Sequence, residues 1–120
     1  MSLIAASLLL QAAVAPLPAE VAEGRWKRAP SVYERALAYP SQAANTRTAG
    51  QATLKCKIND IGAPAHCSVH SETPAGYGFG KALMSLRSKM RFHAPKAGED
   101  SWVLITVKFD PDPKKALLIY

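Results

Sequence analysis

The sequence predicts a small α+β domain in which an amphipathic helix covers one face of a β-sheet. Two segments, Gln51–Ile58 and Trp102–Phe109, place apolar side chains at alternate positions, as a strand with a dry face does. A third segment, Phe79–Met90, spaces its apolar side chains at the period of a helix. The chain has 120 residues, 48% of them hydrophobic, which suits one domain with one core.

The N-terminal segment is typical of the apolar core of a secretory signal peptide. Leu3 to Ala15 carries no charge and is shorter than the roughly 20 residues of a membrane-spanning helix. Ala13 and Ala15 offer small side chains to a signal peptidase, whereas the following Pro16 and the lack of a preceding Lys or Arg are atypical. We expect residues 1–22 to be a signal peptide or a short inner-membrane anchor, with a buried helix as the alternative. Export implies an oxidising compartment, the periplasm.

The segment after this leader is predicted to be a linker followed by short helices. Pro16 to Arg28 is rich in Pro, Ala and Glu and then basic. Ser31 and Glu34 have the spacing of a capping box, which predicts a short helix over Ser31–Ala38 that Pro40 ends. A second helical turn is expected over residues 41–46. The predicted organisation is a signal or anchor at 1–22, a linker with a possible short helix at 23–38, the domain at 39–110 and a tail at 111–120.

Two strands around the turn Asn59–Gly62 are predicted to form a β-hairpin. A turn centred on Ile61 and Gly62 places Cys56 directly opposite Cys67, at a separation close to that of a disulfide. A structural disulfide is therefore expected in an oxidising compartment, with a redox pair or a metal site as alternatives. The expected dry faces are Ala52, Leu54, Cys56 and Ile58 in the first strand and Ala65, Cys67 and Val69 in the second.

The helix and the final strand supply the rest of the predicted core. The apolar residues of Phe79–Met90 follow one another at spacings of 4, 3 and 4: Phe79, Leu83, Leu86 and Met90. The final strand turns its odd-numbered residues toward the core. Its other face is unusually apolar because of Trp102 and Leu104. This second face either packs under the C-terminal tail or forms a binding row.

The order of short motifs resembles the TonB C-terminal domain family. The resemblance covers the chain from Tyr39 to Phe109. Its parts are Tyr39-Pro40-x-x-Ala43, Gly50 before a strand, Asp60-x-Gly62 at the hairpin turn, Pro74-x-Gly76 through Phe79 before a helix, Phe92-x-x-Pro95, and a closing strand ending at Phe109. The resemblance implies a TonB/TolA C-terminal-like fold, with two layers in which a three-stranded antiparallel sheet packs against helices.

The resemblance also implies a function and a site. Family members are periplasmic energy transducers that support energised transmembrane transport, and they bind the TonB-box peptide of outer-membrane receptors by strand addition. Carried over to this chain, the implied partner-binding residues are Tyr39, Pro40, Trp102, Val103, Leu104, Ile105, Thr106, Val107, Lys108 and Phe109. Further implied partners are inner-membrane motor proteins or peptidoglycan, and a homodimer through edge strands is possible.

The chain departs from the family pattern in ways that concern energy transduction. Its N-terminal apolar run is short and lacks a His, and the 15 residues from Pro16 to Pro30 reach at most about 50 Å. Ala36 and Leu37 stand where the family's best-known version has Gln and Pro shortly before Tyr-Pro. The alternative function is therefore a structural envelope module that binds peptidoglycan or another periplasmic protein without transmitting force.

Other classes of function find little support in the sequence. The net charge is +6, but the basic residues are spread along the chain and no nucleic-acid motif accompanies them. His66 and His70 are expected about 13 Å apart on one strand, too far to share a metal ion. No nucleophile with a base is recognisable, so an enzyme is not expected. No metal or cofactor is expected.

Overall fold

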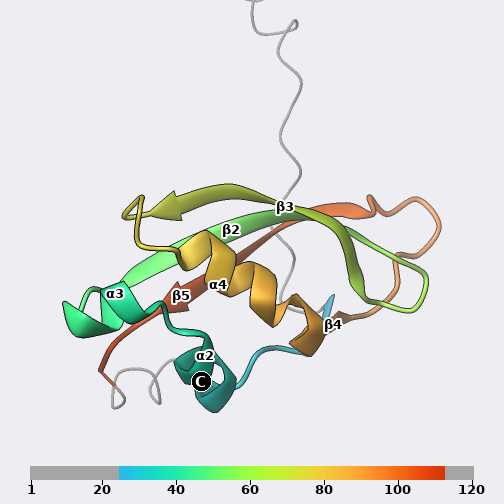
Figure 1. Ribbon diagram of the computed structural model, residues 1–120. Helices are drawn as coiled ribbons and strands as arrows, with labels where there is room; N and C mark the ends of the chain where they lie inside the picture. The colour runs from blue at the N-terminus through green and yellow to red at the C-terminus, as the bar shows by residue number, and fades with distance from the viewer. Residues whose placement is uncertain (1–24, 113–120) are drawn as a thin grey trace, which may run out of the picture.

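A computed structural model describes residues 25–112 as an α+β domain (Figure 1). Its central sheet has three antiparallel strands in the order β3-β2-β5, and the helices lie together on one side of it, which confirms the predicted class. The elements in chain order are β1 (Trp26–Arg28), α2 (Val32–Ala38), α3 (Ser41–Asn45), β2 (Gly50–Ile58), β3 (Pro64–Thr73), α4 (Phe79–Leu86), the 3-10 helix η2 (Arg87–Lys89), β4 (Arg91–Phe92) and β5 (Trp102–Phe109).

The predicted leader at 1–22 and most of the predicted tail lie outside the described residues. Among residues 25–112, no helix combines the length and the apolar character needed to cross a membrane.

The central strand β2 pairs differently with its two neighbours. Its register with β5 is continuous, from Gly50 opposite Phe109 to Lys57 opposite Trp102. Its register with β3 shifts twice, and the extra residues on β3 are His66 and His70. His66 has a φ of 49°, which is unusual for a residue other than glycine. One edge of the sheet is therefore bulged and the other is regular.

The predicted disulfide is present between Cys56 and Cys67. Their Cα atoms lie 4.2 Å apart, as expected for directly opposed residues in a pair without backbone hydrogen bonds. The hairpin turn is held by Asn59, whose side-chain Oδ1 accepts hydrogen bonds from the backbone N–H groups of Ile61 and Ala63. The cysteine pairing agrees with the predicted register, but next to the turn the register differs by one residue, with Lys57 opposite Ala65 and Ile58 opposite Pro64. The bulge at His66 restores the pairing of Cys56 with Cys67, and neither bulge was predicted.

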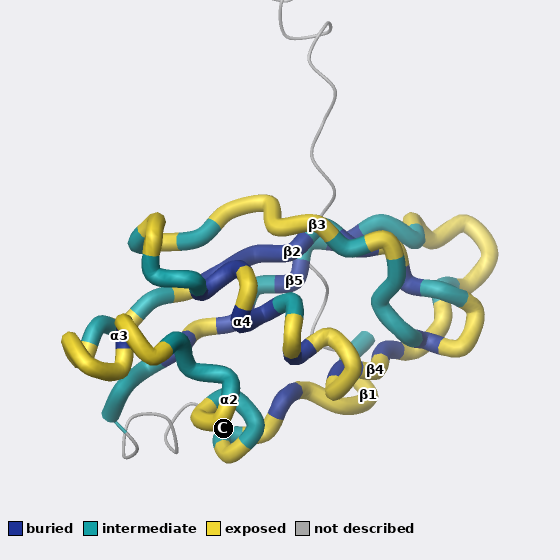
Figure 2. Tube along the Cα trace, viewed as in Figure 1, coloured by how far each residue is buried: buried dark blue, intermediate teal, exposed yellow. Residues whose placement is uncertain are grey.

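The core lies between the sheet and α4. Figure 2 shows that buried positions gather along β2, β5 and α4. The predicted faces of β2 and β5 are confirmed. In β3 the prediction is wrong for Ala65, which lies opposite the exposed Lys57 on the outer face, because the bulge at His66 changes the alternation. Val69 lies on the helix side, near Gly80, but is 45% exposed. The buried apolar residues of the three elements are Ala52, Leu54, Cys56 and Ile58 of β2, Val103, Ile105, Val107 and Phe109 of β5, and Phe79, Ala82, Leu83 and Leu86 of α4.

The helix predicted over Phe79–Met90 is regular only to Leu86 and then tightens into η2. Met90, the last residue of the predicted apolar stripe, is nevertheless fully buried. The 3-10 turn keeps Met90 on the core side while the chain leaves the helix to enter β4.

The prediction of a linker from Pro16 to Arg28 is wrong for its last residues. Trp26–Arg28 form β1, which pairs with β4 in a second, two-stranded sheet. The ring of Trp26 packs on Phe92 with 4.3 Å between centroids. The hairpin turn completes this contact, because the Phe92 backbone N–H donates to the Gly62 carbonyl at 2.8 Å.

Helix α2 begins with the predicted capping box. The Glu34 backbone N–H donates to the Ser31 hydroxyl at 3.0 Å, and the Ser31 backbone N–H donates to the Glu34 carboxylate at 2.9 Å. The same carboxylate pairs with Arg28 at 2.8 Å. The hydrogen bonds from Arg28 and from the Ser31 backbone lower the pKa of Glu34 to about 2. One carboxylate thus ties β1 to α2.

Candidate functional site

Strand β5 forms one edge of the central sheet. The Ile58 backbone N–H donates to the Ser101 carbonyl at 2.7 Å, so odd-numbered residues of this segment turn their backbone polar groups toward β2. Even-numbered residues of β5 therefore turn their N–H and C=O groups toward the outer edge. Two contacts agree with this assignment: the Trp102 N–H donates to Asp100 Oδ1 at 3.0 Å, and the Lys108 carbonyl accepts from Arg35 Nη1 at 3.3 Å.

The predicted binding residues of β5 divide into two groups. The odd-numbered residues Val103, Ile105, Val107 and Phe109 are buried in the core, so their side chains are not available to a partner. The even-numbered side chains lie on the opposite face of the sheet. There Trp102, Leu104 and Thr106 are half-buried, and Lys108 is exposed.

The outer face of the sheet is organised by neighbouring β2 side chains. The hydroxyls of Thr106 and Thr53 lie 2.8 Å apart, and the Lys55 ammonium lies 5.4 Å from the centroid of the Trp102 ring. Residues 113–120 of the tail lie outside the described residues, and both predicted roles for Trp102 and Leu104 stay predictions.

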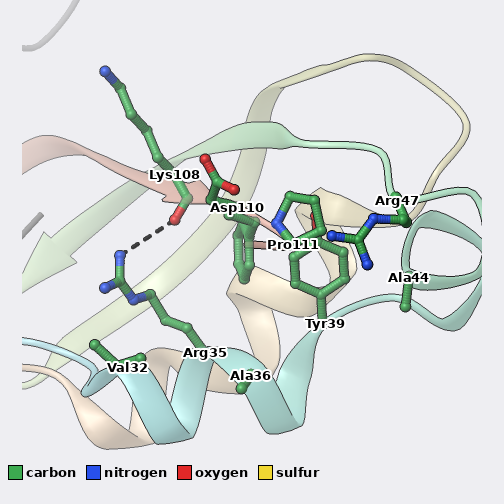
Figure 3. A pocket seen from close by; sticks show the side chains of 10 residues that line it. Val32, Arg35, Ala36, Tyr39, Ala44, Arg47, Lys108, Asp110 and Pro111 are labelled. Carbon is green, nitrogen blue, oxygen red and sulfur yellow. Dashed lines mark hydrogen bonds between the residues drawn. The ribbon is translucent and has the colours of Figure 1, made fainter. Parts of the chain in front are cut away.

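A hollow of about 260 Å³ opens beside the C-terminal end of β5 (Figure 3). It lies between that strand end and α2, and Figure 3 shows Arg35 reaching from α2 to the Lys108 carbonyl. A second hollow, of about 470 Å³, shares Arg35 and Lys108 with the first as lining residues. We call the two together the β5-edge groove. The first hollow is lined by Val32, Arg35, Ala36, Tyr39, Ala44, Arg47, Lys108, Phe109, Asp110 and Pro111, and the second by Trp26, Ala29, Pro30, Arg35, Thr106, Val107 and Lys108.

Tyr39 forms a wall of the first hollow and belongs to the aromatic core at the same time. Its ring stands edge-on to Phe79 and Phe109, with centroids 5.8 and 6.0 Å away. Its hydroxyl donates to the Thr48 carbonyl. Burial and the nearby Asp110 carboxylate raise the pKa of Tyr39.

The structure brings Tyr39 together with the end of β5 but does not do the same for Pro40. The first hollow has Tyr39, Lys108 and Phe109 among its lining residues. Pro40 is the N-cap of α3 and lies against Gly78 instead. The implied role of Pro40 in binding is therefore indirect at most, through the position of Tyr39.

Sequence reasoning missed the contribution of α2 to the groove. The capping box predicted the helix, but its packing beside β5 depends on tertiary contacts that leave no local pattern. Arg35 and Arg47, with Lys108, bring positive charge to the first hollow, and Asp110 brings a negative one. The groove thus combines an apolar wall, cationic groups and the backbone edge of a strand.

Within residues 25–112, no cluster of three or more His, Cys, Asp or Glu side chains is arranged to hold a metal ion. His66 and His70 occupy the bulges of β3, on the strand at the opposite edge of the sheet from β5.

No family model and no curated protein matches the chain. Among solved structures, the chain is similar to the TonB2 protein from Vibrio anguillarum, with 22% identity over 81% of this chain and 92% of that one, at a TM-score of 0.49. It is also similar to the TonB C-terminal domain of Pseudomonas aeruginosa, with 17% identity over 80% of this chain and 93% of that one, at a TM-score of 0.48. Both are TonB proteins, and TonB is the family that the motif order of this chain resembles.

Proposed function

We propose that the protein is a TonB-like binding module of the bacterial periplasm that recognises an extended peptide by strand addition at β5. The proposed ligand is the TonB-box segment of an outer-membrane receptor, bound in support of energised transport. The observation that carries the proposal is the regular outer edge of β5 beside the β5-edge groove. The motif order from Tyr39 to Phe109 supports the same reading.

The contrast between the two sheet edges supports β5 as the docking strand. A visiting strand needs evenly alternating backbone donors and acceptors. The register of β5 is unbroken over its whole length, whereas β3 carries bulges at His66 and His70. Bulges interrupt such a template and are one way in which proteins protect an exposed edge.

The contacts already made along the β5 edge define where a peptide would pair. At one end the Trp102 N–H is engaged by Asp100, and at the other the Lys108 carbonyl is engaged by Arg35. Between them, Leu104 directs both backbone groups to the outer edge. We expect a peptide to pair around Leu104. As it extends toward the first hollow, it would compete with Arg35 for the Lys108 carbonyl.

The test is a titration of the isotope-labelled protein with a synthetic TonB-box peptide, followed by NMR of backbone amides. We expect the largest shifts in β5 and in the α2 residues that line the groove. Shifts concentrated in β3, or no shifts in β5, would refute recognition at this edge.

A matched pair of variants separates backbone pairing from side-chain contact. Leu104→Pro removes the outward N–H, and proline is tolerated at such edge positions, whereas Leu104→Ala removes the side chain and keeps the N–H. One net hydrogen bond is worth about 1 kcal/mol, so the proline variant should bind roughly five- to tenfold more weakly than the alanine variant. Equal affinities would count against strand addition.

A further inference from the structure

A basic surface forms where the first described strand meets the end of α4. β1 contributes Lys27 and Arg28, and the segment after α4 contributes Arg87, Lys89 and Arg91. These two segments are far apart in sequence, and the pairing of β1 with β4 brings them together. All five side chains are exposed. We call these five residues the basic patch.

The basic patch concentrates like charge at a cost to local stability. Arg28 and Arg91 are partners in the β1–β4 register, and like charges directly opposite each other destabilise a strand pair. Arg28 is compensated by Glu34, and Arg91 donates to the Met90 carbonyl at 2.6 Å.

Arg28 is the one cation of the patch that an acidic group compensates within the described residues. Within residues 25–112, Lys27, Arg87 and Lys89 form no ion pair. The patch therefore keeps a net positive field that favours an anionic partner.

Exposed apolar side chains beside the patch indicate which kind of anionic partner fits. The Arg28–Glu34 ion pair holds α2 next to β1, and α2 exposes Tyr33 by 71% and Leu37 by 69%. These two residues are one helical turn apart and so share a face. Lysine and arginine beside an exposed aromatic and an aliphatic side chain suit the headgroup region of an anionic bilayer. A nucleic acid or a sugar polymer gains little from an exposed leucine.

We propose that the basic patch docks the domain on an anionic lipid bilayer, with Tyr33 and Leu37 entering the headgroup region. The proposal rests on the envelope location that the proposed function assumes. It uses a different surface, because no residue of the basic patch lines either hollow of the β5-edge groove. Docking would keep the groove close to the membrane from which the expected anchor or signal emerges.

The test is flotation of the full chain with two kinds of vesicle, phosphatidylcholine alone and phosphatidylcholine with phosphatidylglycerol. Any insertion of the N-terminal apolar run contributes to both, so the ratio of the two partition coefficients reports the charge-dependent part. The variant is Lys27→Gln/Arg87→Gln/Lys89→Gln. Each cation near an anionic surface raises the partition coefficient by about a factor of five. The ratio of the two partition coefficients should therefore fall roughly a hundredfold in this variant.

The matched control is Lys57→Gln/Lys81→Gln/Lys96→Gln, which removes the same charge from exposed positions outside the patch. We expect it to keep most of the wild-type ratio, and we expect added salt to reduce that ratio. Equal losses in the two triple variants, or a wild-type ratio near one, would overturn the proposal. Binding to purified murein that depends on the patch, without a vesicle preference, would overturn it in favour of a polymer. Peptide binding at β5, measured separately, tests the proposed function on its own.

Discussion

The contact between Gly62 and β4 offers a sharp test of how the second sheet is joined to the first. A Cβ atom added at Gly62 would lie 1.9 Å from the Phe92 carbonyl oxygen, at a φ of +80°. Gly98 has a similar φ of +87°, but a Cβ atom there meets nothing within 4 Å. Gly98→Ala should therefore cost only the left-handed strain of about 1 kcal/mol.

Gly62→Ala should cost more, because the alanine must also push Phe92 away. The displacement breaks the hydrogen bond from the Phe92 N–H to the Gly62 carbonyl, at 2.8 Å, and Phe92 is only 1% exposed. Losing a buried hydrogen bond adds about 1–3 kcal/mol, for a total of roughly 3 kcal/mol.

Urea denaturation of the two glycine variants measures the difference directly. We expect Gly62→Ala to lose about 2 kcal/mol more than Gly98→Ala, with little change in the denaturant slope. If both variants lost the same stability, the packing of the hairpin turn on β4 would not contribute as argued, and the left-handed strain alone would explain the result.

Two further predictions concern the disulfide and the capping box. Replacing Cys56 and Cys67 together by alanine should lower the free energy of unfolding by about 3 kcal/mol, from the closure of an 11-residue separation. Urea titrations of the oxidised wild type and the variant check this, and coincident midpoints would contradict it. Because the pKa of Glu34 is lowered from 4.5 to about 2, its stabilising contribution is present above about pH 4.5 and is lost as the pH falls toward 2. Glu34→Gln should therefore make the free energy of unfolding fall less steeply as the pH is lowered below about 4.5. An unchanged fall would show that another carboxylate controls it.

The hairpin was predictable because local chemistry fixes its turn, which Asn59 and Gly62 set. The register next to the turn, with Lys57 opposite Ala65, would by itself place His66 opposite Cys56. The bulge at His66 brings Cys67 there instead. The bulges at His66 and His70 were not predictable, since an extra residue on one strand changes the register without changing the composition.

The short sheet of β1 and β4 shows where local reasoning fails. Trp26–Arg28 is too short for any period to be visible, and its two basic residues look like a solvated linker. What makes it a strand is the packing of Trp26 on Phe92, a contact between distant segments. The position of β5 at a sheet edge is also a tertiary fact, because alternation predicts a strand but not its neighbours.

The candidate site combines a predicted strand with an unpredicted wall. Alternation in β5 identified which side chains face the core, but the other wall of the groove comes from α2, whose Arg35 donates to the Lys108 carbonyl. A lone arginine on a short helix has no sequence signature that distinguishes this role from a solvated one.

Tyr39 links the stability of the core to the shape of the proposed binding groove. Its ring contacts Phe79 and Phe109, and its hydroxyl is held by Thr48, so the wall of the first hollow is fixed before any peptide arrives. A preformed edge loses less conformational entropy on binding than one that must order first. Substitutions far from the groove, such as Gly62→Ala, should therefore weaken peptide binding only by lowering the fraction of folded protein. Leu104→Pro should instead lower the affinity of the folded protein itself. Binding measured under conditions in which nearly all of each variant is folded separates the two effects.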